Sequence, residues 1–153
     1  SWQNGVINGS GIATYENGLV YEGAFVNAQY QGQGTMTHED GYTYVGGWAE
    51  GQRNGTGIAT YADGTVYEGE FLNGQRSGQG KITLPDGFTY VGSWQDGDIE
   101  GAGVATYTNG DVYEGNFVDG RREGQGTMTY ATGEESIGTW SDGALVSEDS
   151  ADN

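Results

Sequence analysis

The sequence predicts an all-β fold, an elongated and strongly twisted single-layer antiparallel β-meander of stacked hairpins. Three observations support this prediction. A period of 23 residues runs along the chain without an insertion, 30 of the 31 glycines fall in five columns of that period, and Asn-Gly or Asp-Gly pairs separate segments of alternating polarity. Such pairs indicate hairpins, because a two-residue hairpin turn requires positive φ.

Composition alone predicts the opposite, a disordered acidic chain. Leu, Ile, Val and Phe make up about 16 % of the 153 residues, and the formal net charge is −17. Such a chain normally buries too little apolar surface to offset its conformational entropy. The 19 aromatic residues and their regular spacing argue for a folded repeat array instead.

Each repeat predicts two short strands and two turns. In residues 66–87, the segment 66–72 alternates, with Tyr67, Gly69 and Phe71 on one face. A loop over 73–78 leads to a second strand over 79–84, and a tight turn closes the unit. The tight turns are expected at Asn17-Gly18, Asp40-Gly41, Asp63-Gly64, Asp86-Gly87 and Asn109-Gly110. About 13 strands at roughly 4.8 Å each would span about 60 Å.

Two aromatic columns recur at this period. One holds Trp2, Phe25, Trp48, Phe71, Trp94, Phe117 and Trp140, and the other holds Tyr21, Tyr44, Tyr67, Tyr90 and Tyr113. Glycines inside strands usually allow the close approach of another group. We therefore expect these rings to stack over the glycines and form the core. The alternative is an exposed aromatic groove that binds a partner.

The period sets the domain organisation. We assign residues 1–146 to the repeat array, with a partial unit over 1–20, units starting at 21, 44, 67, 90 and 113, and a partial unit over 136–146. Residues 147–153 are expected to be a flexible acidic tail. The array starts inside a unit, which indicates a fragment of a longer protein or a truncated cap. Phe and Trp alternate, so the true period is 46, through packing or recent duplication.

The unit from Tyr67 to Gly80, closed by Asp86-Gly87, resembles the MORN repeat (membrane occupation and recognition nexus). The same frame starts at Tyr21, Tyr44, Tyr90 and Tyr113, and the resemblance covers residues 2–143. It implies a non-enzymatic dimerisation or docking module, with a protein or a second copy of the chain as partner. The alternative that the family name suggests is binding to anionic phospholipids.

Charge argues against lipid and nucleic acid as partners. One edge carries eight acids and no cation, at Glu16, Glu39, Asp40, Asp63, Asp86, Asp111, Glu134 and Glu135. The other edge is mixed, and its Arg53, Arg76, Arg121 and Arg122 are the candidate loop-edge contacts. Nucleic acids and anionic membranes attract basic surfaces. A chain of net charge −17 is therefore expected to bind neither.

No catalytic, cofactor or metal site is expected. The chain has no cysteine and one histidine, His38, which we expect to be a packed or rim residue. Its carboxylates lie mostly in turns, where the backbone favours Asp and Asn, and no calcium-loop pattern occurs. The chain shows no signal-peptide pattern and no long apolar run, which favours a cytoplasmic location.

Overall fold

The structure, a computed structural model, describes residues 2–3 and 6–149, and within them it contains strands and no helix. Strands β1 (Trp2–Gln3) and β2 (Val6–Ile7) pair with each other as a separate hairpin. The other strands are β3 (Gly9–Thr14), β4 (Val20–Val26), β5 (Gln29–Thr37), β6 (Thr43–Ala49), β7 (Gln52–Thr60), β8 (Val66–Leu72), β9 (Gln75–Thr83), β10 (Thr89–Gln95), β11 (Asp98–Thr106), β12 (Val112–Val118), β13 (Arg121–Thr129), β14 (Glu135–Ser141) and β15 (Ala144–Glu148). The described residues include no helix able to cross a membrane.

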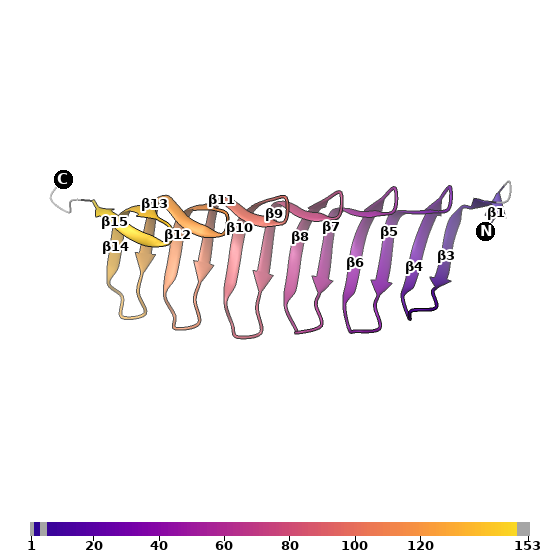
Figure 1. Cartoon of the computed structure of the whole chain (residues 1–153), viewed down its shortest axis with the longest axis horizontal. Coiled ribbons are helices and arrows are strands. Elements are labelled where there is room, and N and C mark those ends of the chain that lie inside the picture. Colours follow the sequence, from indigo (N-terminus) through magenta and orange to yellow (C-terminus); the bar gives the residue numbers. More distant parts are fainter. Residues whose placement is uncertain (1, 4–5, 150–153) are drawn as a thin grey trace. The chain divides into compact units, whose positions relative to one another are not determined.

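These strands form an antiparallel meander, as predicted. The chain divides into two units, Ser1–Arg76 and Ser77–Asn153, and the division falls inside β9. In the first unit β3 to β8 pair in chain order, and in the second unit β9 to β15 do the same. Figure 1 shows the succession of hairpins within each unit. The thirteen strands of the sheet match the predicted number.

Side chains alternate across each strand as the sequence pattern predicts. In β8 the rings of Tyr67 and Phe71 are buried, whereas Glu68, Glu70 and Leu72 are exposed. The same two buried positions recur in β4, β6, β10 and β12. One face of the sheet therefore carries the aromatic core, and the opposite face is open to solvent.

Broad loops lie along one edge of each unit and tight turns along the other (Figure 1). In one broad loop, the amide of Tyr61 donates to the carbonyl of Thr65 at 2.8 Å, and the amide of Gly64 donates to the carbonyl of Tyr61 at 2.9 Å. The Asp63 carboxylate accepts the amide of Thr65 at 2.8 Å. Gly64 has a φ of 98°, but Asp63 is not among the residues with positive φ.

The prediction that these Asp-Gly and Asn-Gly pairs form two-residue turns is therefore wrong. The two-residue turns lie on the opposite edge, for example at Asn73-Gly74, with φ of 52° and 85°. Corresponding turns occur at Asn27-Ala28, Glu50-Gly51, Asp96-Gly97, Asp119-Gly120 and Asp142-Gly143. Positive φ at both central residues is typical of type I′ hairpin turns. Pairing resumes directly after each turn, so residues 75–78, expected as loop, belong to β9.

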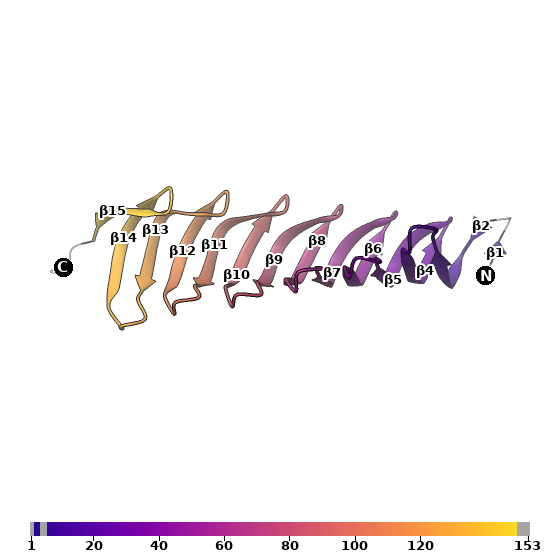
Figure 2. The same cartoon turned by 60° about the horizontal axis from the view of Figure 1, so that its bottom comes forward.

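The pairing of the nine-residue strands β5, β7, β11 and β13 with the strand before the tight turn contains an irregularity. Gly115 of β12 pairs with Gly126 of β13, but the next pair joins Phe117 to Arg122, so β13 carries two extra residues. Gly124 lies in this stretch with a φ of 81°. A bulge of this kind strengthens the local twist and bends the strand, and the strands in each unit are visibly curved (Figure 2). The bend brings residues from the start of the long strand over the aromatic core.

The last strand extends further than the sequence predicts. Gly138 of β14 pairs with Glu148 of β15, and Ser147 pairs with Thr139. Ser147 and Glu148 therefore belong to the sheet rather than to a flexible tail. The amide of Asp149 donates to the carbonyl of Ile137 at 2.7 Å, and residues 150–153 of the predicted tail lie outside the described residues.

Candidate interaction surface

Five tyrosines form the most deeply buried column of the structure. Their side chains have no exposed surface, and each belongs to a seven-residue strand: Tyr21, Tyr44, Tyr67, Tyr90 and Tyr113. Each hydroxyl donates to the backbone carbonyl three residues ahead, at 2.8–3.1 Å. The hydroxyl is thus satisfied inside the sheet, as a buried polar group requires. Burial raises the pKa of Tyr44, Tyr67 and Tyr90 to about 12.

Glycines in the facing strand leave the space that these rings occupy. A Cβ placed on Gly57 would lie 2.5 Å from Cζ and 2.6 Å from Cε2 of Tyr44. Gly34, Gly103 and Gly126 stand in the same relation to Tyr21, Tyr90 and Tyr113. Glycine is therefore required here for volume, in agreement with the prediction that glycines make room for aromatic rings.

The Phe and Trp column packs edge-on against the tyrosines. Tyr44 contacts Trp48 in its own strand and Phe71 in the next repeat, with ring centroids 5.2 and 5.0 Å apart and nearly perpendicular planes. The exposed fraction is 6 % for Trp48 and 3 % for Phe71. Trp2 lies in β1, but its side chain is outside the described part of the structure. From Phe25 onward, the residues of both predicted aromatic columns are thus part of the core.

The tryptophans have a bond that the phenylalanines cannot make. The indole nitrogens of Trp48, Trp94 and Trp140 donate to the carbonyls of Gly34, Gly80 and Gly126 at 3.0–3.1 Å. Phenylalanine has no such donor, so this bond recurs every 46 residues. The alternation of Phe and Trp therefore has a structural counterpart in the packing.

Three of the four predicted loop-edge arginines lie over the aromatic core instead. Arg53 lies 5.3 Å from the ring centre of Phe71, Arg76 lies 5.8 Å from that of Tyr67, and Arg122 lies 5.1 Å from that of Trp140. They are the second residues of the long strands β7, β9 and β13. Their position was missed because residues 52–55 and their equivalents were expected to be loop.

Two of these arginines also join successive repeats. Arg53 donates from Nη2 to the carbonyl of Gly74 at 2.6 Å, and its own carbonyl accepts the amide of Gly74 at 2.9 Å. Arg122 and Gly143 make the same reciprocal pair. Arg121 remains at the exposed edge, where it forms an ion pair with Asp142 at 2.8 Å. The arginines are therefore held by the chain itself and do not form a basic patch.

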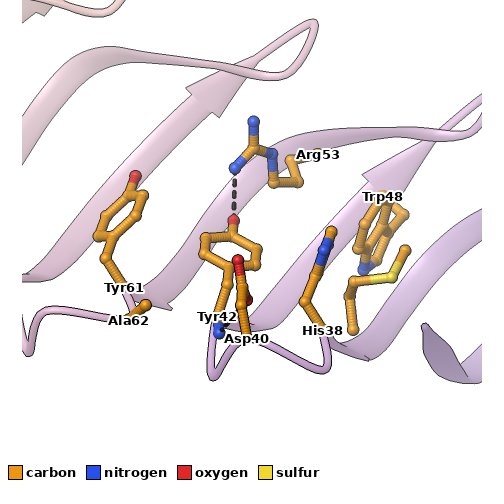
Figure 3. A pocket seen from close by; sticks show the side chains of 8 residues that line it. His38, Asp40, Tyr42, Trp48, Arg53, Tyr61 and Ala62 are labelled. Carbon is orange, nitrogen blue, oxygen red and sulfur yellow. Dashed lines mark hydrogen bonds between the residues drawn. The ribbon is translucent and has the colours of Figure 1, made fainter. Parts of the chain in front are cut away.

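The clearest concave site lies in the first unit at the broad-loop edge, and we call it the aromatic groove (Figure 3). It has a volume of about 550 Å³ and is lined by Met36, His38, Asp40, Tyr42, Trp48, Arg53, Tyr61 and Ala62. Trp48 and Met36 come from the buried columns, whereas the other residues belong to the loops and the strand ends. The groove thus opens beside the core.

Three rings form one wall of the aromatic groove. The Tyr42 ring lies 5.0 Å from His38 in an edge-on contact and 5.3 Å from Tyr61 in a tilted one. The loop that carries Tyr42 is closed by bonds from the His38 amide to the Tyr42 carbonyl at 2.8 Å and from the Tyr42 amide to Asp40 at 3.0 Å. The loop's own hydrogen bonds therefore hold Tyr42 in this wall.

The two ends of the aromatic groove differ in charge. Arg53 donates from Nη1 to the Tyr42 hydroxyl, whereas Asp40 lies toward the loop (Figure 3). Burial raises the pKa of Tyr42, and the nearby Arg53 guanidinium opposes this effect. Tyr42 is therefore neutral at physiological pH and donates or accepts hydrogen bonds as a phenol. The acidic end at Asp40 is exposed to solvent.

The second unit contains a corresponding ring pair. Phe88 and Tyr107, which lie 46 residues after Tyr42 and Tyr61, have ring centres 5.4 Å apart at 52°, compared with 5.3 Å and 55° in the first unit. Asp86 accepts the amide of Phe88 at 3.0 Å, as Asp40 does that of Tyr42. Sequence reasoning missed these pairs because it followed the buried columns. The 46-residue recurrence of the edge aromatics could have revealed them.

The opposite face of the sheet offers a shallower surface. Val45, Ile58 and Val91 are between 42 % and 50 % exposed on it. A hollow of about 350 Å³ in the second unit is lined by Gln79, Val91, Gly92, Ala102, Gly103, Val104, Glu114, Gly115 and Asn116. This surface lacks the ring wall of the aromatic groove, so it is the weaker candidate for binding.

Comparisons with known proteins agree with the repeat pattern. A family model described as MORN repeat matches residues 1–20, 21–41, 44–66, 67–89, 90–112 and 113–135. No curated protein sequence matches the chain significantly.

Two of the solved structures that match this chain are TCP domains. The TCP domain of Drosophila melanogaster SAS-4, in complex with a proline-rich motif of Ana2, is 17 % identical with a TM-score of 0.55, covering 86 % of this chain and 73 % of its own. The TCP10 domain of Danio rerio CPAP is 15 % identical with a TM-score of 0.46, covering 94 % and 68 %. At 17 % identity, the similarity to the SAS-4 TCP domain supports a shared fold and nothing more.

Proposed function

Because the chain belongs to the MORN repeat family, we propose that it is a non-enzymatic scaffold that binds an extended segment of a partner protein in the aromatic groove. The observation that supports this proposal most directly is the open ring wall of His38, Tyr42 and Tyr61 beside the core. Aromatic residues are enriched at the energetic centres of protein interfaces, because their rings bury much area with little loss of side-chain entropy.

An extended, proline-rich segment is the kind of ligand that such a wall accommodates. Aromatic-lined grooves bind polyproline II segments, because these segments are already ordered and present flat apolar faces. The SAS-4 TCP domain, which shares the fold, was solved in complex with a proline-rich motif. By analogy, we assign the same class of ligand to this chain.

The alternative ligands have less support. The candidate arginines contact rings, turn carbonyls or Asp142, so they offer little basic surface to attract anionic lipid. Flotation with phosphoinositide-containing liposomes is therefore expected to show no binding at physiological salt. Homodimerisation is the other possibility that the family suggests, and sedimentation at two concentrations would detect it.

Peptide selection tests the proposal. Short random peptides displayed on phage are selected against the immobilised chain, and their affinities are measured by fluorescence anisotropy. Tyr61→Ala should weaken the selected peptides about tenfold or more, as expected for an aromatic hot spot. Val45→Ala, on the opposite face of the first unit, is the matched control and should leave binding unchanged. Equal binding to both variants would contradict the proposal.

A further inference from the structure

We infer that the partner segment carries positive charge beside its apolar or proline residues, and that its cations lie at the broad-loop edge of the aromatic groove. This inference rests on the proposed function, since it assigns the charge of the ligand that the groove accepts. Three features support it: the carboxylates near the groove, the position of Arg53, and the recurrence of Asp40 as Asp86 beside a ring pair in the second unit.

Carboxylates border the groove on its loop side. Asp40 lines it, and Asp63 follows the lining residue Ala62. Glu39 precedes Asp40, with its side chain next to Gly18 of the preceding loop. All three are exposed. The first unit contains eight acids and two arginines, Arg53 and Arg76. Neither arginine lies in a broad loop. Both are second residues of long strands and lie near the tight-turn edge. A ligand cation that enters from the loop side therefore meets only negative charge.

The groove's own cation is directed elsewhere. Arg53 is held by the Tyr42 hydroxyl and the Gly74 carbonyl, at the end of the ring away from the loop. It is thus placed to meet backbone carbonyls of a ligand rather than to neutralise Asp40. The two ends of the groove therefore carry opposite charges, with the Asp40 carboxylate at the loop end and the Arg53 guanidinium at the other end.

The side chains of lysine and arginine suit such a surface. Their aliphatic stems can lie along aromatic rings while the charged group reaches the carboxylates. A ring face also attracts a cation directly. Glutamate or aspartate in the ligand would face Glu39, Asp40 and Asp63 without compensation, which disfavours an acidic partner.

Part of the arrangement recurs in the second unit, where Pro85 and Asn109 stand at the positions of Glu39 and Asp63. Asp86, Phe88 and Tyr107 repeat Asp40, Tyr42 and Tyr61 after 46 residues. Ile99 stands where Arg53 would recur, and the carboxylate and the ring pair are retained. Asp86 accepts the loop amide of Phe88, as Asp40 accepts that of Tyr42, and it keeps one carboxylate beside the ring pair where the arginine is absent.

Charge variants of matched size test the inference. The first variant is Glu39→Gln, Asp40→Asn and Asp63→Asn, which removes three charges beside the groove. Asparagine conserves the loop, because Asn17 accepts the corresponding amide at 3.1 Å. The control is Glu22→Gln, Glu50→Asn and Glu68→Gln, which removes three exposed charges of the same unit on the opposite face and edge. Asparagine occupies the matching turn position at Asn73 with the same φ of 52°.

The probes are the phage-selected peptides whose binding depends on Tyr61. We expect these peptides to be enriched in lysine and arginine, and the groove variant to weaken them about tenfold, with a smaller response to salt. The control variant should weaken them less than about twofold. Groove-dependent peptides that are neutral or acidic, or equal effects of the two variants, would overturn the inference and leave the proposed function standing. Recovery of only peptides insensitive to Tyr61→Ala would overturn both.

Discussion

Replacing the glycine beneath a buried tyrosine should destabilise the sheet strongly. In Gly57→Ala, the new Cβ would lie 2.5 Å from Cζ of Tyr44, about 1 Å closer than carbon atoms normally approach. The ring has little freedom to move away, since its hydroxyl donates to the Gly47 carbonyl at 2.9 Å and Trp48 and Phe71 pack against it. Overpacking in a core costs about 1–3 kcal/mol and occasionally more, and we expect about 3 kcal/mol here.

Gly11→Ala provides a control in the same glycine column. A Cβ at Gly11 would lie 3.6 Å from the nearest atom of Phe25, an ordinary contact. Urea unfolding followed by tryptophan fluorescence and circular dichroism measures both variants. With a slope of about 2 kcal/mol/M, Gly57→Ala should lower the midpoint by about 1.5 M, whereas Gly11→Ala should shift it by less than about 0.3 M.

A double variant identifies the source of the cost. If the clash with the ring is responsible, Tyr44→Leu combined with Gly57→Ala should cost less than the sum of the single variants. The reasoning would be refuted by strict additivity, or by equal midpoints for Gly57→Ala and Gly11→Ala.

Three further predictions concern single side chains and pH. Tyr44→Phe should cost about 1–2 kcal/mol in urea unfolding, because the buried Gly47 carbonyl loses its hydroxyl donor; no change would mean that water replaces it. Ala28→Gly should stabilise the protein by about 1 kcal/mol, since Ala28 has a φ of 65° where other repeats place glycine. A lower unfolding midpoint for this variant would contradict the idea that Ala28 is strained. Stability should fall between pH 10 and pH 12, because burial raises the pKa of Tyr44, Tyr67 and Tyr90 from 10.0 to about 12, and the unfolded chain ionises first. With three such rings the slope approaches about 4 kcal/mol per pH unit, and a flat profile by alkaline titration would exclude this linkage.

The buried columns could be predicted because their spacing reflects their environment. Tyr67, Gly69 and Phe71 alternate with exposed residues, and no insertion disturbs the frame. The size of the rings and the absence of side chains on the facing glycines together identify the core. Such a pattern can be interpreted directly, because successive side chains of a pleated strand point to opposite faces.

The turns and the arginines could not be predicted from the same pattern. Asp63-Gly64 and Asn73-Gly74 look alike in sequence, but only the second has positive φ at both residues. The difference depends on where strand pairing resumes. The amide of Thr65 donates to the Asp63 carboxylate, whereas β9 begins directly after Gly74. Because 75–78 was taken as loop, the path of Arg76 over the core was also missed.

The order in which strands pair has a consequence for how the protein folds. Within each unit, every strand of the sheet pairs with strands that precede or follow it directly in the chain. Sequence-local contacts require little loop closure, which permits faster folding than in β-sandwiches with distant pairings. In linear arrays, folding can also begin at any repeat and spread to its neighbours. Amide hydrogen exchange should therefore be slowest in interior strands such as β6 and β12 and increase stepwise toward β3 and β15.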